Sequence, residues 1–135
     1  MQIADCKLQI GNCKRYMESK SNQLSERMLD YAVEIVRLTT QLRKTATGRQ
    51  IASQLLRSGT SVGANYEEAC GAQSRADFAH KLQIVLKELR ESRFWLRLVQ
   101  KTGIINDARI GDLISETEQL INIIARSVIT VKSKK

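Results

Sequence analysis

Proline is absent from the sequence, and glycine occurs only seven times in 135 residues. Since these are the usual residues of tight turns and strand ends, their scarcity argues against a many-stranded fold and favours long, uninterrupted helices. Aromatic residues make up 4% of the chain, too few for the base-stacking platforms of typical single-strand nucleic-acid binders. No apolar run approaches the ~20 residues of a membrane span, and the N-terminus has no signal-peptide core. These absences predict a soluble, cytoplasmic protein without a membrane partner.

Residues that carry catalysis or bind metals are also scarce. His80 is the single histidine, so a Ser-His-Asp arrangement would depend entirely on it, and no nucleophile motif accompanies it. Cys6, Cys13 and Cys70 form an odd, scattered set, which is not a disulfide framework and fits a reducing compartment. Their spacing with His80 is not that of a metal site. We therefore predict no catalytic residue, no cofactor and no metal ion.

Positively charged residues outnumber negatively charged ones. Lysine and arginine number 22 against 14 acidic residues, which gives a net charge of +8 and an isoelectric point near 9.7. This balance favours a polyanionic partner, most plainly nucleic acid. The alternative is a soluble domain whose positive charge has no role in binding. Net charge alone distinguishes only weakly between the two.

Apolar residues recur at helical spacing in four segments. The first three predicted helices span residues 22–44, 47–71 and 74–102, and the fourth begins near Asn106 or Asp107 and carries apolar residues as far as Val128. Thr47 and Ser74 each open a capping-box pattern, and Gly103 follows the third segment as a stop signal. Because the connections are only a few residues long, consecutive helices must fold back on one another. The sequence thus predicts an all-α, antiparallel up-down-up-down four-helix bundle.

The two ends of the chain differ from this pattern. Residues 1–21 contain a near-repeat of period seven, in which Asp5-Cys6-Lys7 returns as Asn12-Cys13-Lys14. Two heptads are too few for a stable coiled coil, so we expect either a disordered leader arm or a short amphipathic helix. The bundle is expected over residues 22–131, and residues 132–135 form a basic tail.

The stretch "RSGTSVGANYEEACG" places Gly59 and Gly63 four residues apart inside the second predicted helix. Each interior glycine costs a helix about 0.5–1 kcal/mol relative to alanine. At about 100° per residue, both glycines fall on the same side as the core residues Leu55, Val62 and Tyr66. We interpret the pair as a notch that allows close helix packing; a functional kink or a ligand notch is the alternative.

The third predicted helix has two apolar faces, although an isolated bundle needs only one buried stripe per helix. The first contains Leu82, Leu89 and Leu96. The second lies well over 100° away on the helical wheel, and aromatic residues of this kind are typical of subunit interfaces. The residues of this candidate oligomer interface are His80, Ile84, Glu91, Phe94, Trp95 and Leu98. The alternative is that these aromatics only cover the edge of the bundle.

Beside that second face runs a basic ridge on the same helix. It consists of Lys87, Arg90, Arg93, Arg97 and Lys101, which fall within roughly 120° of arc. Such a ridge can neutralise phosphates without reading sequence. The alternative is that Glu88 and Glu91 pair with its arginines and leave an ordinary solvated surface.

Two long runs of the sequence resemble a known family. "SERMLDYAVEIVRL" and "QLLRSGTSVGANYEEACGAQSRADFAHKLQIVLKELRESRFWLRLV" are similar to the four-helix-bundle proteins of the 23S rRNA intervening-sequence type. The resemblance implies a helical bundle that assembles as a homo-oligomeric ring, typically a pentamer. It also implies kinship with the accessory protein of diversity-generating retroelements, a basic pentameric barrel that binds nucleic acid and a reverse transcriptase. It supplies no catalytic residue.

Together these observations predict a non-enzymatic, basic, homo-oligomeric helical bundle that binds RNA or DNA through phosphate contacts. The alternative is a protein-interaction scaffold or adaptor that recruits an acidic protein or a nucleic-acid enzyme.

Overall fold

The structure, a computed structural model, describes residues 10–133, with side chains from residue 19 on. Its helices are α1 (Ile10–Leu42), α2 (Ala46–Cys70), α3 (Arg75–Thr102) and α4 (Arg109–Ser133). No strand occurs in the described range, so the prediction of an all-α chain with four helices is confirmed.

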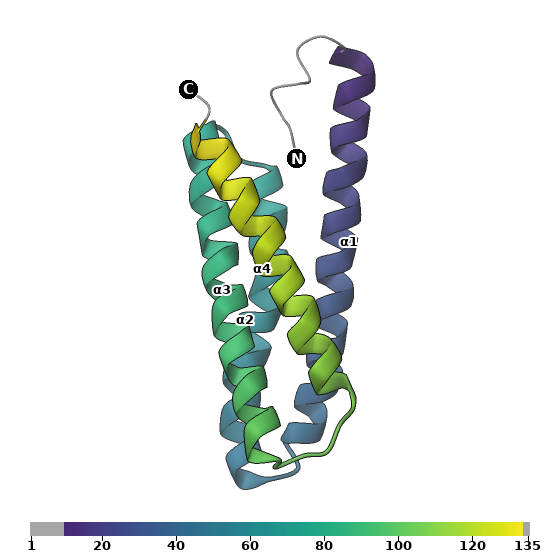
Figure 1. Cartoon of the computed structure of the whole chain (residues 1–135), viewed down its shortest axis with the longest axis vertical. Coiled ribbons are helices and arrows are strands. Elements are labelled where there is room, and N and C mark those ends of the chain that lie inside the picture. The colour runs from purple at the N-terminus through teal and green to yellow at the C-terminus, as the bar shows by residue number, and fades with distance from the viewer. Residues whose placement is uncertain (1–9, 134–135) are drawn as a thin grey trace.

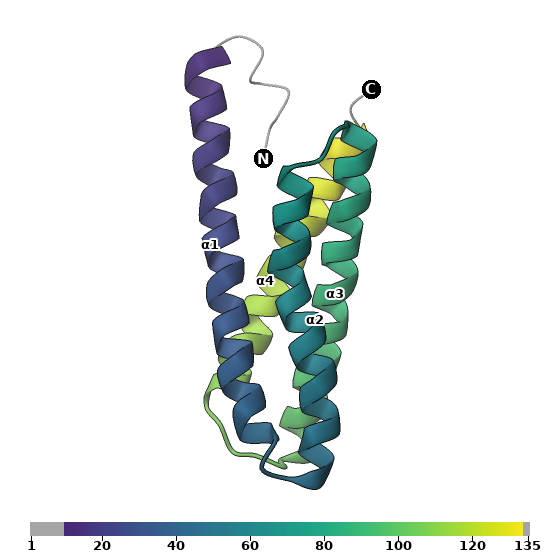
Figure 2. The same cartoon turned by 180° about the vertical axis from the view of Figure 1, so that it is seen from behind.

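The chain reverses direction at each connection (Figure 1). The α1–α2 and α3–α4 connections lie at one end of the molecule and the α2–α3 connection at the other. Helices α2 and α3 pack closely along their length, as do α3 and α4, whereas α4 leaves α1 as it runs towards its C-terminus (Figures 1 and 2). Among the described residues the backbones of α1 and α3 do not approach each other, and side chains such as Tyr31 and Ser92 meet only across the core between them. These two helices therefore occupy opposite corners of the bundle.

Local signals set most helix ends. Ser74 caps α3, because its side chain accepts a hydrogen bond from the Asp77 amide at 3.0 Å. Gly103 ends α3 in the left-handed conformation with φ 64°, which glycine adopts without steric cost. The predicted cap of α2 was wrong. Thr45, rather than Thr47, is the cap residue, and its hydroxyl accepts from the Gly48 amide at 2.9 Å.

The first helix is longer than predicted. A boundary was expected at Asn22, but α1 begins at Ile10 and passes through that position without a break. Residues 10–21 therefore continue the first bundle helix rather than forming a separate arm. The rest of the predicted leader, residues 1–9, and the last two residues of the predicted tail, 134 and 135, lie outside the described residues.

Gly59 and Gly63 lie in an unbroken helix and face α1. A Cβ atom built on Gly59 would lie 2.8 Å from Cγ2 of Ile35. One built on Gly63 would lie 3.6 Å from Cβ of Met28, an ordinary van der Waals distance. Both partners are fully buried, so the two glycines lie where α2 packs against α1, and of the pair only Gly59 has no room for a methyl group.

A layer of buried hydroxyl groups crosses the middle of the apolar core. It takes one residue from each helix: Tyr31, Ser58, Ser92 and Thr117, each at most 2% exposed. Tyr31 Oη lies 2.7 Å from Thr117 Oγ1, which in turn donates to the Leu113 carbonyl. Ser92 Oγ donates to Ser58 Oγ at 2.9 Å. Because each of these hydroxyls has a hydrogen-bond partner, the layer avoids the cost of burying unsatisfied polar groups. We call these four residues the hydroxyl layer.

Candidate nucleic-acid interface

The basic ridge lies along the C-terminal two thirds of α3. Arg90, Arg97 and the two lysines of the ridge are exposed, and Arg93 is half-buried. Successive positions of a helix rise by about 1.5 Å per residue, so Lys87 and Lys101 lie about 21 Å apart along the axis. The ridge is therefore a linear, solvent-facing array of cations rather than a pocket.

The carboxylates that could neutralise the ridge are engaged elsewhere. Glu88 and Glu91 both form ion pairs with Arg57 of α2, with 3.3 Å between Arg57 Nη1 and Glu88 Oε2. The alternative in which these two residues pair with the arginines of their own helix is therefore wrong. No carboxylate in the described part of the chain forms an ion pair with a ridge residue. The ridge cations are therefore not individually paired, and four of the five, Lys87, Arg90, Arg97 and Lys101, are exposed to solvent.

Further cations gather at the end of the molecule near Lys101. The α1–α2 and α3–α4 connections share this end (Figure 1). Arg43, Lys44 and Arg49, at the end of α1 and the start of α2, are exposed and form no ion pair with any described residue. Arg57 of α2 is bound to its two glutamates and adds no unpaired cation to the ridge. Positive charge thus continues from the ridge towards one end of the bundle, not across α2.

The six residues predicted as an oligomer interface do lie on the outer side of α3, but they differ in exposure. We call this set the Phe94 face. Phe94 is 58% exposed, and its ring packs edge-on against Trp95 with 5.0 Å between centroids. His80 is exposed, whereas Ile84, Glu91, Trp95 and Leu98 are half-buried.

Three members of the Phe94 face are partly occupied within the subunit. Glu91 is held by Arg57, and Trp95 and Leu98 pack against the bundle core. The Nε1 atom of Trp95 is buried and has no acceptor among the described residues. Phe94 is therefore the side chain of this face that offers most apolar surface to a partner.

A second exposed apolar surface was missed at the sequence level. Leu29, Val33 and Val36 of α1 are 55%, 39% and 46% exposed, and their spacing of four and three residues aligns them on one side of the helix. We call them the α1 stripe. The sequence did carry this signal, since the segment "MLDYAVEIV" has more apolar residues than one core-facing stripe requires.

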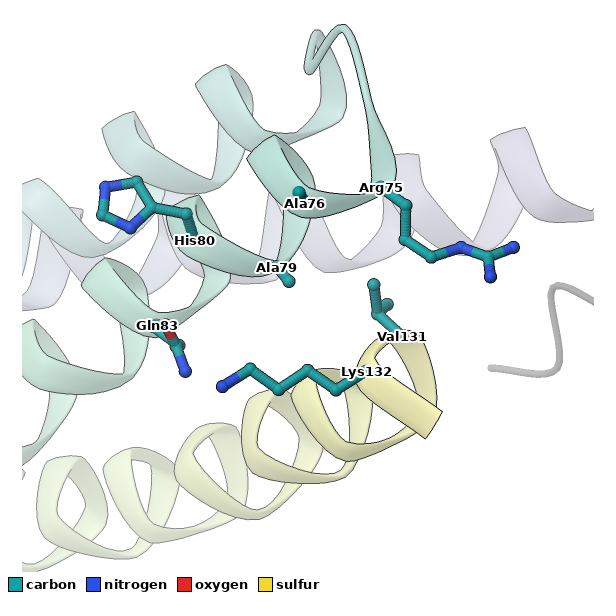
Figure 3. Close-up of a pocket in the computed structure, with 7 residues that line it drawn as sticks. All are labelled: Arg75, Ala76, Ala79, His80, Gln83, Val131 and Lys132. Atoms are coloured by element: carbon teal, nitrogen blue, oxygen red, sulfur yellow. The ribbon is translucent and has the colours of Figure 1, made fainter. Parts of the chain in front are cut away.

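An open hollow of about 730 Å³ lies between the start of α3 and the end of α4. It is lined by Arg75, Ala76, Ala79, His80, Gln83, Val131 and Lys132. Figure 3 shows the Lys132 side chain extending towards Gln83, while the Arg75 guanidinium and the His80 ring point away in opposite directions. Because these groups do not converge on one point, the hollow does not form an anion site of the kind that fixes a small ligand.

The described residues contain no group of three potential metal ligands. None of the helices in this part of the chain carries an apolar segment long enough to traverse a membrane. Cys13 lies where side chains are not described, and Cys6 lies outside the described residues altogether. Cys70 is exposed, with its sulfur 3.1 Å from Ser21 Oγ.

The fold and its surface define a small, all-helical protein with a cationic array on one helix. The chain belongs to the family of 23S rRNA-intervening sequence proteins, whose pattern matches residues 20–126. It is similar to the crystal structure of a protein with unknown function from the S23 ribosomal protein family of Bacteroides thetaiotaomicron VPI-5482. The two are 37% identical with a TM-score of 0.74, over 82% of this chain and 99% of the other. No curated protein matches the chain.

Proposed function

We propose that this protein is a non-enzymatic, homo-oligomeric antiparallel bundle that binds RNA or DNA through its phosphates. The basic ridge provides the contacts. The observation that carries the proposal is that Arg57 holds Glu88 and Glu91, so the protein's own carboxylates do not compete with phosphate for the ridge. Family membership supports the assignment without specifying a ligand.

Phosphate binding of this kind is driven by counterion release. Each phosphate neutralised by lysine or arginine lowers the logarithm of the association constant by roughly 0.9 per tenfold increase in salt for duplex DNA and 0.7 for single strands. A ridge of five cations in one subunit provides only modest affinity by itself. Assembly into a ring, expected as a pentamer from the family resemblance, repeats the ridge and raises the overall affinity through avidity.

A salt titration with charge-reversed variants tests the proposal. The full-length protein is titrated into single-stranded and duplex RNA and DNA oligonucleotides at several salt concentrations. We expect Arg97→Glu/Lys101→Glu to weaken binding and to flatten the salt dependence. The matched control, Arg126→Glu/Lys132→Glu, makes the same change in net charge at exposed positions on α4 and should keep the wild-type slope. Binding that is insensitive to salt, or equal losses in both variants, contradicts the proposal.

A second candidate function is a scaffold or adaptor that recruits an acidic protein or a nucleic-acid enzyme. The exposure of Phe94 beside the ridge favours it, because an exposed aromatic side chain is typical of a protein interface and the neighbouring cations complement an acidic partner. Affinity capture from native extract, with and without nuclease, separates the two functions. A protein partner that survives nuclease treatment supports the scaffold.

A further inference from the structure

The α1 stripe is an apolar surface whose nearest unpaired charges on the helix are carboxylates. Glu26 and Asp30 are exposed near its edge, within about 100° of its centre on the helical wheel. Neither carboxylate forms an ion pair with any residue of the described range. The nearby Arg37 is paired with Glu34 of the same helix, with 2.7 Å between Nη1 and Oε1. The outer face of α1 is thus apolar at its centre and acidic at its edge.

The Phe94 face has the opposite charge pattern. Phe94 and the half-buried Leu98 form its apolar centre. Lys87 and Arg90 lie within roughly 40° of Phe94 on the wheel, and they have no carboxylate partner in the described part of the chain. One helix therefore offers an apolar surface with free carboxylates, and another offers an apolar surface with free cations. Such surfaces match in both hydrophobicity and charge.

The two surfaces cannot meet within one subunit, because α1 and α3 occupy opposite corners of the bundle (Figure 1). Both are outward faces, so they point to different sides of the molecule. A contact between them has to join two copies. A contact that uses two different surfaces is heterologous, and it continues from copy to copy until a ring closes or a filament forms.

We propose that the α1 stripe of one subunit docks on the Phe94 face of a second copy of this chain. This inference rests on the homo-oligomerisation in the proposed function and specifies the surfaces that produce it. Leu29, Val33 and Val36 pack on Phe94 and Leu98 of the neighbour, and Glu26 and Asp30 approach its Lys87 and Arg90. The two carboxylates cannot neutralise the whole ridge, so cations remain available for phosphate.

Two variants, each with one damaged surface, test the proposal. Leu29→Lys/Val36→Lys removes the α1 stripe and adds charges that repel the ridge, whereas Phe94→Glu damages the other surface. All changes are at exposed helical positions, and circular dichroism verifies folding. Ile129→Lys is the matched control, because Ile129 of α4 is an exposed apolar residue, 67% accessible, outside both surfaces. Mass in solution is measured by light scattering in high salt, which removes bound nucleic acid.

The expected result is that each damaged variant is monomeric alone and that their mixture forms a one-to-one heterodimer. In that pair the intact Phe94 face of the first variant binds the intact α1 stripe of the second, and no further copy can add. The Ile129→Lys control should keep the wild-type mass. If Leu29→Lys/Val36→Lys remains a wild-type oligomer, or if the mixture stays monomeric, the docking is refuted while the proposed oligomeric function stands. A wild-type monomer refutes both.

Cross-linking gives an answer that does not depend on weakening the assembly. In a background with serine at the three native cysteine positions, a Val33→Cys chain is mixed with a Phe94→Cys chain under oxidising conditions. We expect a disulfide-linked dimer between the two chains. An Ile129→Cys chain replaces the Val33→Cys chain in the control and should cross-link far less. Equal cross-linking of both pairs overturns the proposal.

Discussion

The glycine pair of α2 yields a prediction in which one substitution controls for the other. Gly59→Ala and Gly63→Ala both replace an interior helical glycine, and both should gain about 0.5–1 kcal/mol of helix propensity. The difference in free energy of unfolding between the two variants therefore reports how well each site accommodates the added methyl group. At Gly63 the nearest atoms to an added Cβ lie at 3.6 to 3.7 Å, all belonging to Met28. The propensity gain should appear in full there, and we expect a variant as stable as the wild type or more stable.

At Gly59 the added methyl group would lie 2.8 and 2.9 Å from Cγ2 and Cγ1 of Ile35, and 3.3 Å from its Cβ. Ile35 is fully buried, and its β-branched side chain has one strongly preferred rotamer in a helix. The helices must then move apart, and overpacking of this kind costs about 1–3 kcal/mol. After subtraction of the propensity gain, Gly59→Ala should lower the free energy of unfolding by up to about 2.5 kcal/mol, and it should be about 1–3 kcal/mol less stable than Gly63→Ala.

Urea unfolding followed by circular dichroism, at one protein concentration for all variants, measures both values. Ile35→Ala supplies the cross-check, because it removes the atoms that the new methyl group would meet. Gly59→Ala should therefore cost less in an Ile35→Ala background, with a favourable coupling energy in the double-mutant cycle. Equal stability of Gly59→Ala and Gly63→Ala would refute the reasoning, since it would mean that Gly59 does not limit the approach of α1 and α2.

Three further predictions concern other parts of the bundle. Burial raises the pKa of Tyr31 from 10.0 to about 12, so the folded state holds this proton when the unfolded state has lost it. The contribution of this proton to the free energy of unfolding is fully present below pH 10 and is lost as the pH rises towards 12, with a loss of about 1.4 kcal/mol at pH 11. Urea unfolding of the wild type and of Tyr31→Phe at pH 9 and pH 11 measures this loss. Gly103→Ala should cost about 1 kcal/mol, because its φ is 64° and the left-handed conformation is unfavourable for a residue with a Cβ; thermal unfolding shows this, and Gly103→Asn should cost less. Arg57→Gln should weaken nucleic-acid binding more than Arg126→Gln does, because it frees two carboxylates beside the ridge; fluorescence anisotropy at one salt concentration compares them.

Helix ends could be predicted from the sequence where the capping signal is local and unambiguous. Ser74 and Gly103 bound α3 as predicted, because each acts through hydrogen bonds or dihedral angles within a few residues. The start of α2 was misplaced because Thr45 and Thr47 carry the same capping chemistry two residues apart. The contact with the end of α1 distinguishes them, since the amide and the hydroxyl of Thr45 both donate to the Leu42 carbonyl, at 3.3 and 3.4 Å.

The candidate site was predictable only as far as it lies on one helix. The helical wheel places the basic ridge on the outer side of α3, and the structure agrees for its exposed members. The partners of Glu88 and Glu91 were not predictable, because the choice between their own helix and Arg57 depends on the register between α2 and α3. The α1 stripe was missed for a related reason. A wheel shows that Leu29 and Val36 differ in direction from the core residues, but not that no other helix covers them.

The hydroxyl layer limits how the bundle can respond when another molecule binds. Sliding any one helix by a turn, about 5.4 Å, would separate the hydroxyl groups of Tyr31 and Thr117, or of Ser58 and Ser92, and bury them without partners. Each lost partner costs about 1–3 kcal/mol, a large fraction of the stability of a small domain. Shear motions between these helices are thus disfavoured, and a neighbouring subunit or a nucleic acid meets a body of fixed internal alignment, whose adaptation on contact is confined to surface side chains.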